Sequence, residues 1–264
     1  MIQALARTVR QRALIVALTR RELVARYRGG ALGFLWSLAN PLLLLAVYAV
    51  VFRFVFSPRA DVRPYALFLF AGVLAWGFVS SSLVDAAETY RNNGPLLRKT
   101  TVAPEVFPAA SVGARLAHLL LALPILIAGT VWFALRGAIR PAWPVVEFPA
   151  VLLLLVLAVF GLALAVASLA VHFADVRDLT ANLLTLAFFL TPVLYPLESV
   201  PERFRPYLRA NPFATFLTAI HDTVFYFRPV AAADWLWMIA TSLLCLALGG
   251  AVFARLRDSI AEEA

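Results

Sequence analysis

The chain has 264 residues, of which 62% are hydrophobic and only 14% are charged, and its formal net charge is +8. One soluble core of this size does not normally bury so much apolar surface, so the composition favours a membrane protein over a soluble enzyme or regulator. The basic excess lies beside apolar stretches, where attraction to anionic membrane lipid accounts for it, and no nucleic-acid partner is expected.

The first 30 residues precede the apolar stretches and contain no small-residue cleavage site after a short apolar core, so we do not expect a secretory signal peptide. We expect residues 1–30 to form a cytoplasmic amphipathic helix at the membrane surface, in preference to a disordered basic tail. At 100° per residue, one side of this helix carries Arg7, Arg10, Arg21 and Arg28, with Leu14 and Leu18 close to them. The opposite side carries Val16, Leu23 and Tyr27.

The junction RYRGGALGFLWSLANP follows this helix and enters the first apolar stretch. We interpret it as a hinge, in which Arg26 and Arg28 end the basic helix while Gly29 and Gly30 supply conformational freedom for the turn into the bilayer. Trp36 is expected near the inner membrane interface as an anchor.

Six stretches lack Asp, Glu, Lys and Arg, and each has the roughly 20 residues that a helix needs to cross the hydrocarbon. We therefore predict an all-α integral membrane protein with six transmembrane helices in a membrane domain over residues 31–254. The predicted spans are about 31–55, 64–85, 107–135, 148–172, 178–196 and 234–254. Most of the Lys and Arg residues outside the spans fall on the side of the N-terminus, so both termini, including the tail 255–264, are expected in the cytoplasm.

The loop over 88–105 joins the second and third spans on the cytoplasmic side. Its residues Asn92 to Pro95 break the preceding helix, and Pro95 is suited to the start of a short new one. The new helix would carry Leu96, Leu97, Arg98 and Lys99. Such a helix is either a solvated connector or a docking site for another protein.

The outer segment 198–228 contains two helix-start patterns. Ser199 and Glu202 fit a capping box, and Asn211 followed by Pro212 fits an N-cap with proline in the first turn. Two short helices are predicted, at about 200–209 and 212–226. The second is too short to span a bilayer, so it either enters the outer leaflet or covers the helix bundle.

The residues give little support for catalysis or metal binding. Cys245 is the only cysteine, and His118 is the only ionisable residue well inside a predicted span, while His172 and His221 are expected at opposite membrane faces. We interpret Asp175, Arg177 and Asp178 as a local ion pair, and Asp85, Glu88 and Arg115 as a structural ion network at the helix ends. No catalytic residue, metal site or cofactor is assigned to this chain.

The interiors of the predicted spans contain no acidic residue, since Asp85, Asp178 and Asp234 stand at span ends, which argues against transport driven by protons or sodium. ATP would have to be hydrolysed elsewhere, because a P-loop ends in G-K-[ST] and the only lysine, Lys99, follows an arginine.

Five motifs together resemble the permease subunits of type-2 ABC exporters that export O-antigen, capsular polysaccharide and teichoic acid. They are RELVARYR, LGFLWSLANPLL, RNNGPLLRK, HFADVRDL and TPVLYPLESVPERFRPYLRANPF, in this order over nearly the whole chain. The chain departs from the family at Gly29 and Gly30, where relatives commonly have a basic residue and then serine.

The resemblance implies a homodimer in the bacterial cytoplasmic membrane, paired with two copies of a separate nucleotide-binding subunit that binds ATP and Mg. The substrate would be a lipid-linked glycan that passes between the two copies of this chain. The family's coupling helix would contain Arg91, Pro95, Leu96, Leu97, Arg98 and Lys99, and the two outer helices would match its re-entrant gate helices.

Aromatic residues gather near the outer end of the predicted bundle: Tyr195, Phe204, Tyr207, Phe213, Phe216, Phe225 and Tyr226. Sugar faces stack on aromatic rings, so this group is a candidate for glycan contacts in a channel or outer gate. The alternative is the aromatic belt found at any membrane interface.

Two other functions fit the same composition. One is a type-2 ABC exporter of a small hydrophobic drug or lipid. The other is an integral membrane enzyme acting on lipid-linked sugars, for which Asp85, Glu88 and Arg115 would be the polar cluster.

Overall fold

The computed structural model describes residues 11–27, 36–54, 64–99 and 102–263, and these form helices and short connections without a β-strand. The N-terminal helices are α2 (Arg12–Tyr27), α3 (Trp36–Phe54), α4 (Tyr65–Asn92) and α5 (Gly94–Lys99). The central ones are α6 (Val106–Leu135), α7 (Phe148–His172) and α8 (Val176–Leu190). The C-terminal ones are α9 (Arg205–Arg209), α10 (Pro212–His221) and α11 (Ala232–Glu263). Short turns of 3-10 helix cover Trp143–Glu147, Leu197–Ser199 and Glu202–Phe204, and one of π-helix covers Asp222–Tyr226.

Four helices in the described part of the chain are long and apolar enough to cross a membrane: α4, α6, the Trp143–His172 stretch that contains α7, and α11 as far as Ile260. They match the predicted second, third, fourth and sixth spans. Two of these helices continue beyond the predicted spans, because α4 runs on to Asn92 and α11 runs through most of the predicted tail. Residues 251–260 contain no glycine or proline to end the last helix.

The predicted fifth span, 178–196, is a shorter helix. The structure ends α8 at Leu190, after 15 residues, and Thr191 is extended with φ −110° and ψ 140°. The reason is local: Pro192 follows, and the residue before a proline is disfavoured in the helical region. The predicted first span corresponds to the 19-residue α3, while residues 31–35 and 55 lie outside the described residues.

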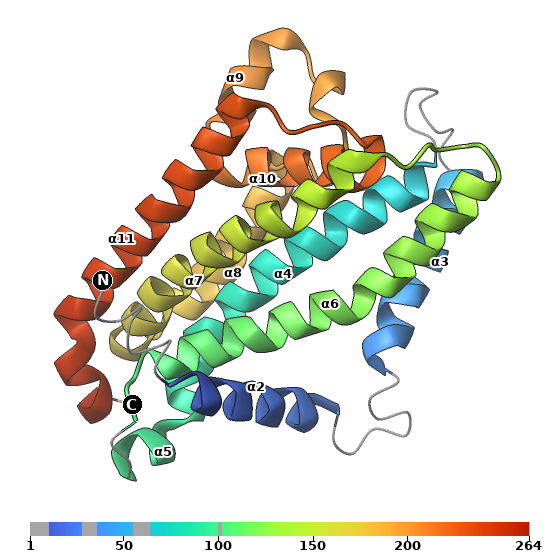
Figure 1. The fold of residues 1–264 in the computed structure, drawn as a ribbon. Coiled ribbons are helices and arrows are strands. Elements are labelled where there is room, and N and C mark those ends of the chain that lie inside the picture. Colours follow the sequence, from blue (N-terminus) through green and yellow to red (C-terminus); the bar gives the residue numbers. More distant parts are fainter. Residues whose placement is uncertain (1–10, 28–35, 55–63, 100–101, 264) are drawn as a thin grey trace.

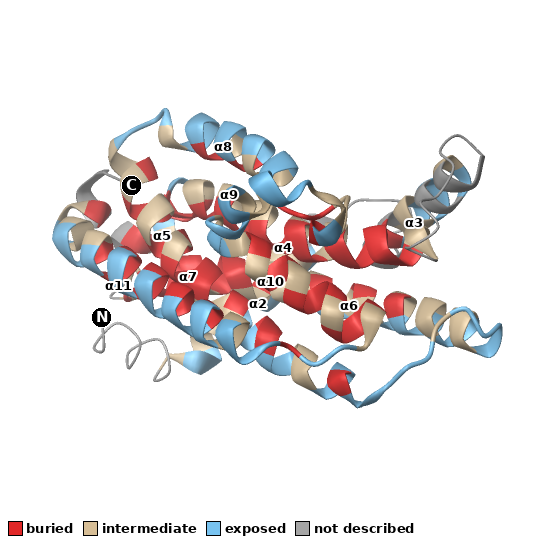
Figure 2. Ribbon diagram, turned by 90° about the horizontal axis from the view of Figure 1, so that it is seen from above, coloured by how far each residue is buried: buried red, intermediate tan, exposed pale blue. Residues whose placement is uncertain are grey.

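The helix α4 lies at the centre of the bundle and packs against α3, α6, α7, α8 and α10. Figure 1 shows α2 and α5 at one end of the bundle and α9 at the other. Burial follows this arrangement, because α4 and α7 are largely buried while α8 and parts of α6 and α11 are exposed on their outer sides (Figure 2). The core of α4 includes Phe68, Phe70 and Val79, each with no exposed surface.

The longest interface joins α7 and α11, and it depends on two glycines. A Cβ atom added to Gly249 would lie 1.7 Å from the carbonyl oxygen of Gly161, and one added to Gly161 would lie 2.4 Å from the backbone of Cys245. The two backbones can approach this closely because neither glycine has a side chain. Ser242 strengthens the interface by donating a hydrogen bond to the Leu154 carbonyl at 2.8 Å.

The helix α2 lies across α6. On its packed side Leu18 is buried and Thr19 donates a hydrogen bond to the Ala110 carbonyl at 3.2 Å, whereas Val16 is 65% exposed. Leu18 was expected close to the arginines, and of these Arg21 remains exposed while its side chain donates a hydrogen bond to Asn93.

One of the two predicted caps in the outer segment is confirmed. The Asn211 side chain accepts a hydrogen bond from the Phe213 backbone amide at 3.0 Å and starts α10. The capping box is wrong: the Ser199 hydroxyl donates to the Pro196 carbonyl at 2.8 Å, and Ser199 ends a 3-10 turn. Pro201 separates this turn from the 3-10 turn Glu202–Phe204 and α9, which together cover most of the helix predicted at about 200–209.

Substitution of Gly249 by alanine should disrupt the α7–α11 interface. The new Cβ meets backbone that cannot rotate away, and forced overpacking costs about 1–3 kcal/mol. We expect the thermal midpoint of the detergent-solubilised protein, measured by fluorescence-detected size exclusion, to fall by about 5 °C or more. Gly77→Ala is the matched control, because a Cβ there meets nothing within 4 Å, and an equal loss in both variants would contradict the account.

Candidate functional site

Two acidic residues one turn apart on α4 organise the charged groups of the bundle. Asp85 accepts two hydrogen bonds from Arg115 of α6, from Nε at 2.5 Å and from Nη2 at 2.6 Å. Glu88 pairs with Arg177 of α8 at 2.8 Å. The two pairs attach α6 and α8 to α4 near the end where α5 lies.

These contacts decide two predictions about charged residues. The ion network of Asp85, Glu88 and Arg115 at the helix ends is confirmed, with Glu88 bound to Arg177 instead of Arg115. The predicted local pair in the HFADVRD turn is wrong, because Arg177 reaches across to α4 and not to its neighbours. Both carboxylates are thus held by arginines, which is the arrangement of a structural network and not of an acid or base poised for a membrane enzyme.

A polar cavity of about 350 Å³ lies between α2, α4 and α6, at the junction of α4 with α5. Arg21 of α2 donates to the side-chain oxygen of Asn93, the residue between α4 and α5. The Asn93 amide donates in turn to the Thr89 carbonyl at 2.8 Å. The helix at the N-terminus is therefore tied directly to the start of α5.

The predicted coupling residues form a short helix, which begins at Gly94, one residue before the predicted start. Pro95 and Arg91 are exposed, Leu96 is half-buried, and Leu97 is only 5% exposed because it belongs to the hydrophobic core. The side chains of Arg98 and Lys99 lie outside the described part. Pro95 and Leu96 are therefore the apolar residues of α5 that another protein could contact.

A second cavity, of about 460 Å³, lies between α4 and α8, and we call it the α4–α8 cavity. It combines aromatic rings with hydroxyl groups, the two groups that bind sugars. The ring of Trp76 lies 6.3 Å from that of Phe188. The rings are those of Trp76, Phe188 and Phe189, and the hydroxyls those of Ser80, Ser81 and Thr185, with Arg115 beside them.

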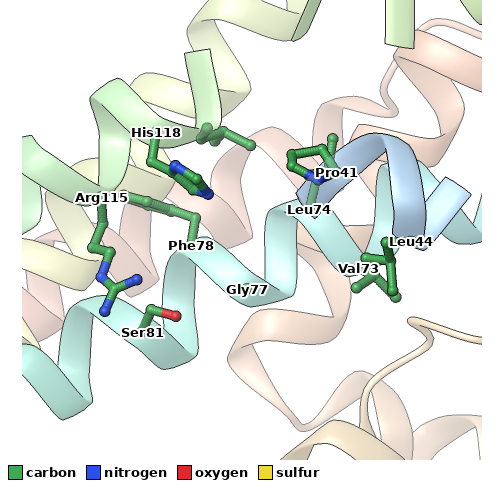
Figure 3. A pocket seen from close by; sticks show the side chains of 10 residues that line it. Pro41, Leu44, Val73, Leu74, Gly77, Phe78, Ser81, Arg115 and His118 are labelled. Carbon is green, nitrogen blue, oxygen red and sulfur yellow. The ribbon is translucent and has the colours of Figure 1, made fainter. Parts of the chain in front are cut away.

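A third cavity, of about 330 Å³, is lined by residues of α3, α4 and α6, and we call it the α3–α6 cavity. Figure 3 shows the side chains of Arg115, His118 and Ser81 near one end of it and those of Pro41 and Leu44 near the other. Arg115 and Ser81 line both this cavity and the α4–α8 cavity.

The predicted group of outer aromatics divides by burial. Phe204 and Tyr207 are exposed, at 46% and 77%, while Phe216 and Phe225 are buried in the core. The remaining three, Tyr195, Phe213 and Tyr226, are half-buried. The buried two are unavailable to a ligand, and the rings that line the α4–α8 cavity, those of Trp76, Phe188 and Phe189, lie on α4 and α8 outside the predicted group.

The turn after α10 carries the main perturbed ionisable groups. The His221 ring stacks on Phe68 with centroids 3.8 Å apart, and burial lowers the pKa of His221 to about 3. Burial, together with Glu198 and Asp234, raises the pKa of Asp222 to about 6. His221 holds the end of α10 against α4 through Phe68, whereas His172 contacts Ser259 at 2.7 Å, so these two histidines do not meet.

No group of three or more potential metal ligands occurs among the residues that the structure describes. Of the predicted hinge, Arg26 lies in α2 and Trp36 begins α3, but their side chains are not described. Arg28, Gly29 and Gly30 lie outside the described residues, so the hinge stays a prediction.

Comparison with known proteins gives a match over most of the chain. Residues 13–225 match the family model described as ABC-2 type transporter. The O-antigen export system permease of Myxococcus xanthus is 33% identical, with 100% of both chains covered. A protein of the same name from Klebsiella pneumoniae is 27% identical over 94% of each chain, and a capsule polysaccharide export inner-membrane protein of Neisseria meningitidis is 24% identical over 95% of this chain and 93% of its own.

The Asp85–Arg115 pair should contribute measurably to stability. Both side chains are about four-fifths buried, so Asp85→Asn or Arg115→Gln alone leaves a charge without its partner. We expect each to lower the thermal midpoint and the double variant to recover part of the loss, with a coupling of about 1–2 kcal/mol in a double-mutant cycle. In the control, Glu202→Gln removes a 3.8 Å pair with a 91% exposed carboxylate and should change nothing measurable. Additive single effects would show that the pair is not a unit.

Proposed function

The chain belongs to the ABC-2 type transporter family, and on that premise we propose that it is the membrane subunit of an ATP-driven exporter of polysaccharide. The similarity along the full length to permeases named for O-antigen and capsule export carries the proposal. The substrate would be a lipid-linked glycan, moved outward across the bacterial cytoplasmic membrane.

The proposed topology has six spans and cytoplasmic termini, with α3 and α8 as the first and fifth spans. At 1.5 Å per residue, the 15-residue α8 covers only about 22 Å, so the extended residues after Leu190 would complete the crossing. Exposed apolar side chains on α8, such as Leu183 and Leu186, would face lipid or a second copy of the chain. We propose a homodimer that binds two copies of the ATPase.

We propose that α5 is the coupling helix and that it contacts a separate nucleotide-binding subunit, which binds ATP and Mg. The sequence supports ATP hydrolysis by a separate subunit, since it contains no P-loop. The Arg21–Asn93 contact supports a role for α2 as well, because it joins α2 to the start of α5. A displacement of α5 by the ATPase would be passed to α4 through Asn93 and to α2 through Arg21.

We propose that the glycan passes along the α4–α8 cavity. Its rings offer stacking surfaces and its hydroxyls offer hydrogen bonds, with only one charged residue in the lining. A neutral or weakly charged glycan fits such a surface. The exposed Phe204 and Tyr207 would lie further out along the path.

A pair of leucine variants tests the docking of the ATPase. Leu96→Asp places a charge on the half-buried, accessible side of α5, so we expect the ATPase to stop co-purifying while the chain still reaches the membrane. Leu97→Asp places a charge in the core and should instead lower the amount of folded protein. If Leu96→Asp retains the ATPase and exports normally, α5 is not the docking site.

A second pair of variants tests the glycan path. Phe189 is 64% exposed and lines the α4–α8 cavity, whereas Leu183 is 55% exposed on the same helix and does not. A stacking contact contributes about 0.5–1.5 kcal/mol, so Phe189→Ala should reduce surface glycan about 2- to 10-fold at equal protein level. Leu183→Ala should leave it unchanged. Equal export in the two variants would exclude Phe189 from the path.

A further inference from the structure

The α3–α6 cavity has a chemistry different from that of the proposed glycan path. We propose that it binds a phospholipid of the inner leaflet, with the phosphate head at Arg115 and Ser81 and a hydrocarbon chain toward Pro41 and Leu44. This inference does not depend on which substrate the protein exports.

The cavity is polar at one end and apolar along the rest of its length. On α6, His118 lies three residues beyond Arg115, or about 4.5 Å along the helix. On α4, Leu74 lies seven residues before Ser81, or about 10 Å along the helix, and Val73 lies beside it. The lining thus changes from cationic and hydroxyl groups to purely apolar ones over about two helical turns (Figure 3). A phospholipid shows the same order, because its charged phosphate head is followed by an apolar acyl chain.

The polar end lies toward the α5 end of α4, far along the helix from Tyr65. Ser81 is 16 residues, or about 24 Å, from the start of α4 at Tyr65, and the hydrocarbon core is about 30 Å thick. Arg115 lies opposite, nine residues after the start of α6 on the same side of the membrane. In the proposed topology this side is the cytoplasmic one.

The guanidinium of Arg115 is oriented for a second anion. Asp85 takes the Nε and Nη2 edge, and Nη1 makes no hydrogen bond among the described residues. A guanidinium has five N–H donors, so the Arg115 side chain, itself 20% exposed, keeps donors for a phosphate oxygen. Since Asp85 offsets its charge, binding would depend on directed hydrogen bonds from Arg115 and Ser81 more than on net charge.

Gly77 keeps the cavity open. It lies in the interior of α4, where alanine would favour the helix by about 0.8–1.0 kcal/mol, and a Cβ there would meet nothing within 4 Å. Gly72 on the same helix is different, because a Cβ there would lie 2.6 Å from the Val193 carbonyl oxygen. Close packing therefore requires glycine at position 72 but not at 77. At 77, the absence of a side chain leaves space in the cavity wall.

The experiment measures the phospholipid that remains bound when the full-length chain, with any subunit that co-purifies, is extracted in mild detergent. Native mass spectrometry counts retained phosphatidylglycerol per chain in three proteins: the wild type, Gly77→Ala and Gly77→Leu. We expect the wild type and Gly77→Ala to retain it equally, because a methyl group leaves most of the space. Gly77→Leu fills the cavity without altering a charge and should retain at least fivefold less. Thermal midpoints confirm that all three are folded.

A second purification tests whether the bound phosphate belongs to a phospholipid or to a lipid-linked glycan. The wild type is purified from cells that make no surface glycan, so that no lipid-linked glycan is present. Phosphatidylglycerol retained there, and lost in Gly77→Leu, supports the proposal. Retention of a lipid-linked glycan instead, equal retention by Gly77→Leu, or no retained lipid in the wild type would each overturn it. None of these measurements depends on export activity, so failure of this proposal can be distinguished from failure of the proposed function.

Discussion

The bundle depends on how the carboxylates near the α5 end of α4 are paired. Asp85 pairs with Arg115, where both side chains are about four-fifths buried and an unpaired charge is costly, and Glu88 pairs with Arg177. Because the two arginines belong to α6 and α8, the pairs fix the position of both helices relative to α4. The large apolar faces then pack around α4, with the glycine contact between α7 and α11 closing the other side.

This pairing also organises the proposed functions. Arg115 and Ser81 line two cavities beside α4, one with rings and hydroxyls and one with a mostly apolar lining. A few residues further along α4, Asn93 connects the same helix to α2 and α5. A movement of α5 would therefore reach α4, its ion pairs and both cavities through continuous contacts. That continuity gives a physical route from a nucleotide-binding partner to the proposed glycan path.

The sequence predicted the helical class and four of the long helices, because uncharged stretches of about 20 residues have few other solutions in a membrane. It also predicted the Asn211 cap and the existence of α5, which depend on local residues. It failed where tertiary contacts decide. Arg177 pairs with Glu88 of another helix, and Phe216 and Phe225 belong to the core. Pro192 favours the early end of α8, whereas the predicted span extended over the whole uncharged stretch to residue 196. The cavities could not be predicted, since their linings come from three helices.

Transport of a lipid-linked glycan in proteoliposomes tests the central claim most directly. The chain is reconstituted with its co-purified ATPase in the orientation that leaves the ATPase outside, and glycan protected inside the vesicles is measured over time. The account predicts protection that needs ATP and both subunits, and none with the chain alone. Glycan that becomes protected equally without ATP or without the ATPase would contradict it, as would an active ATPase complex that moves no glycan.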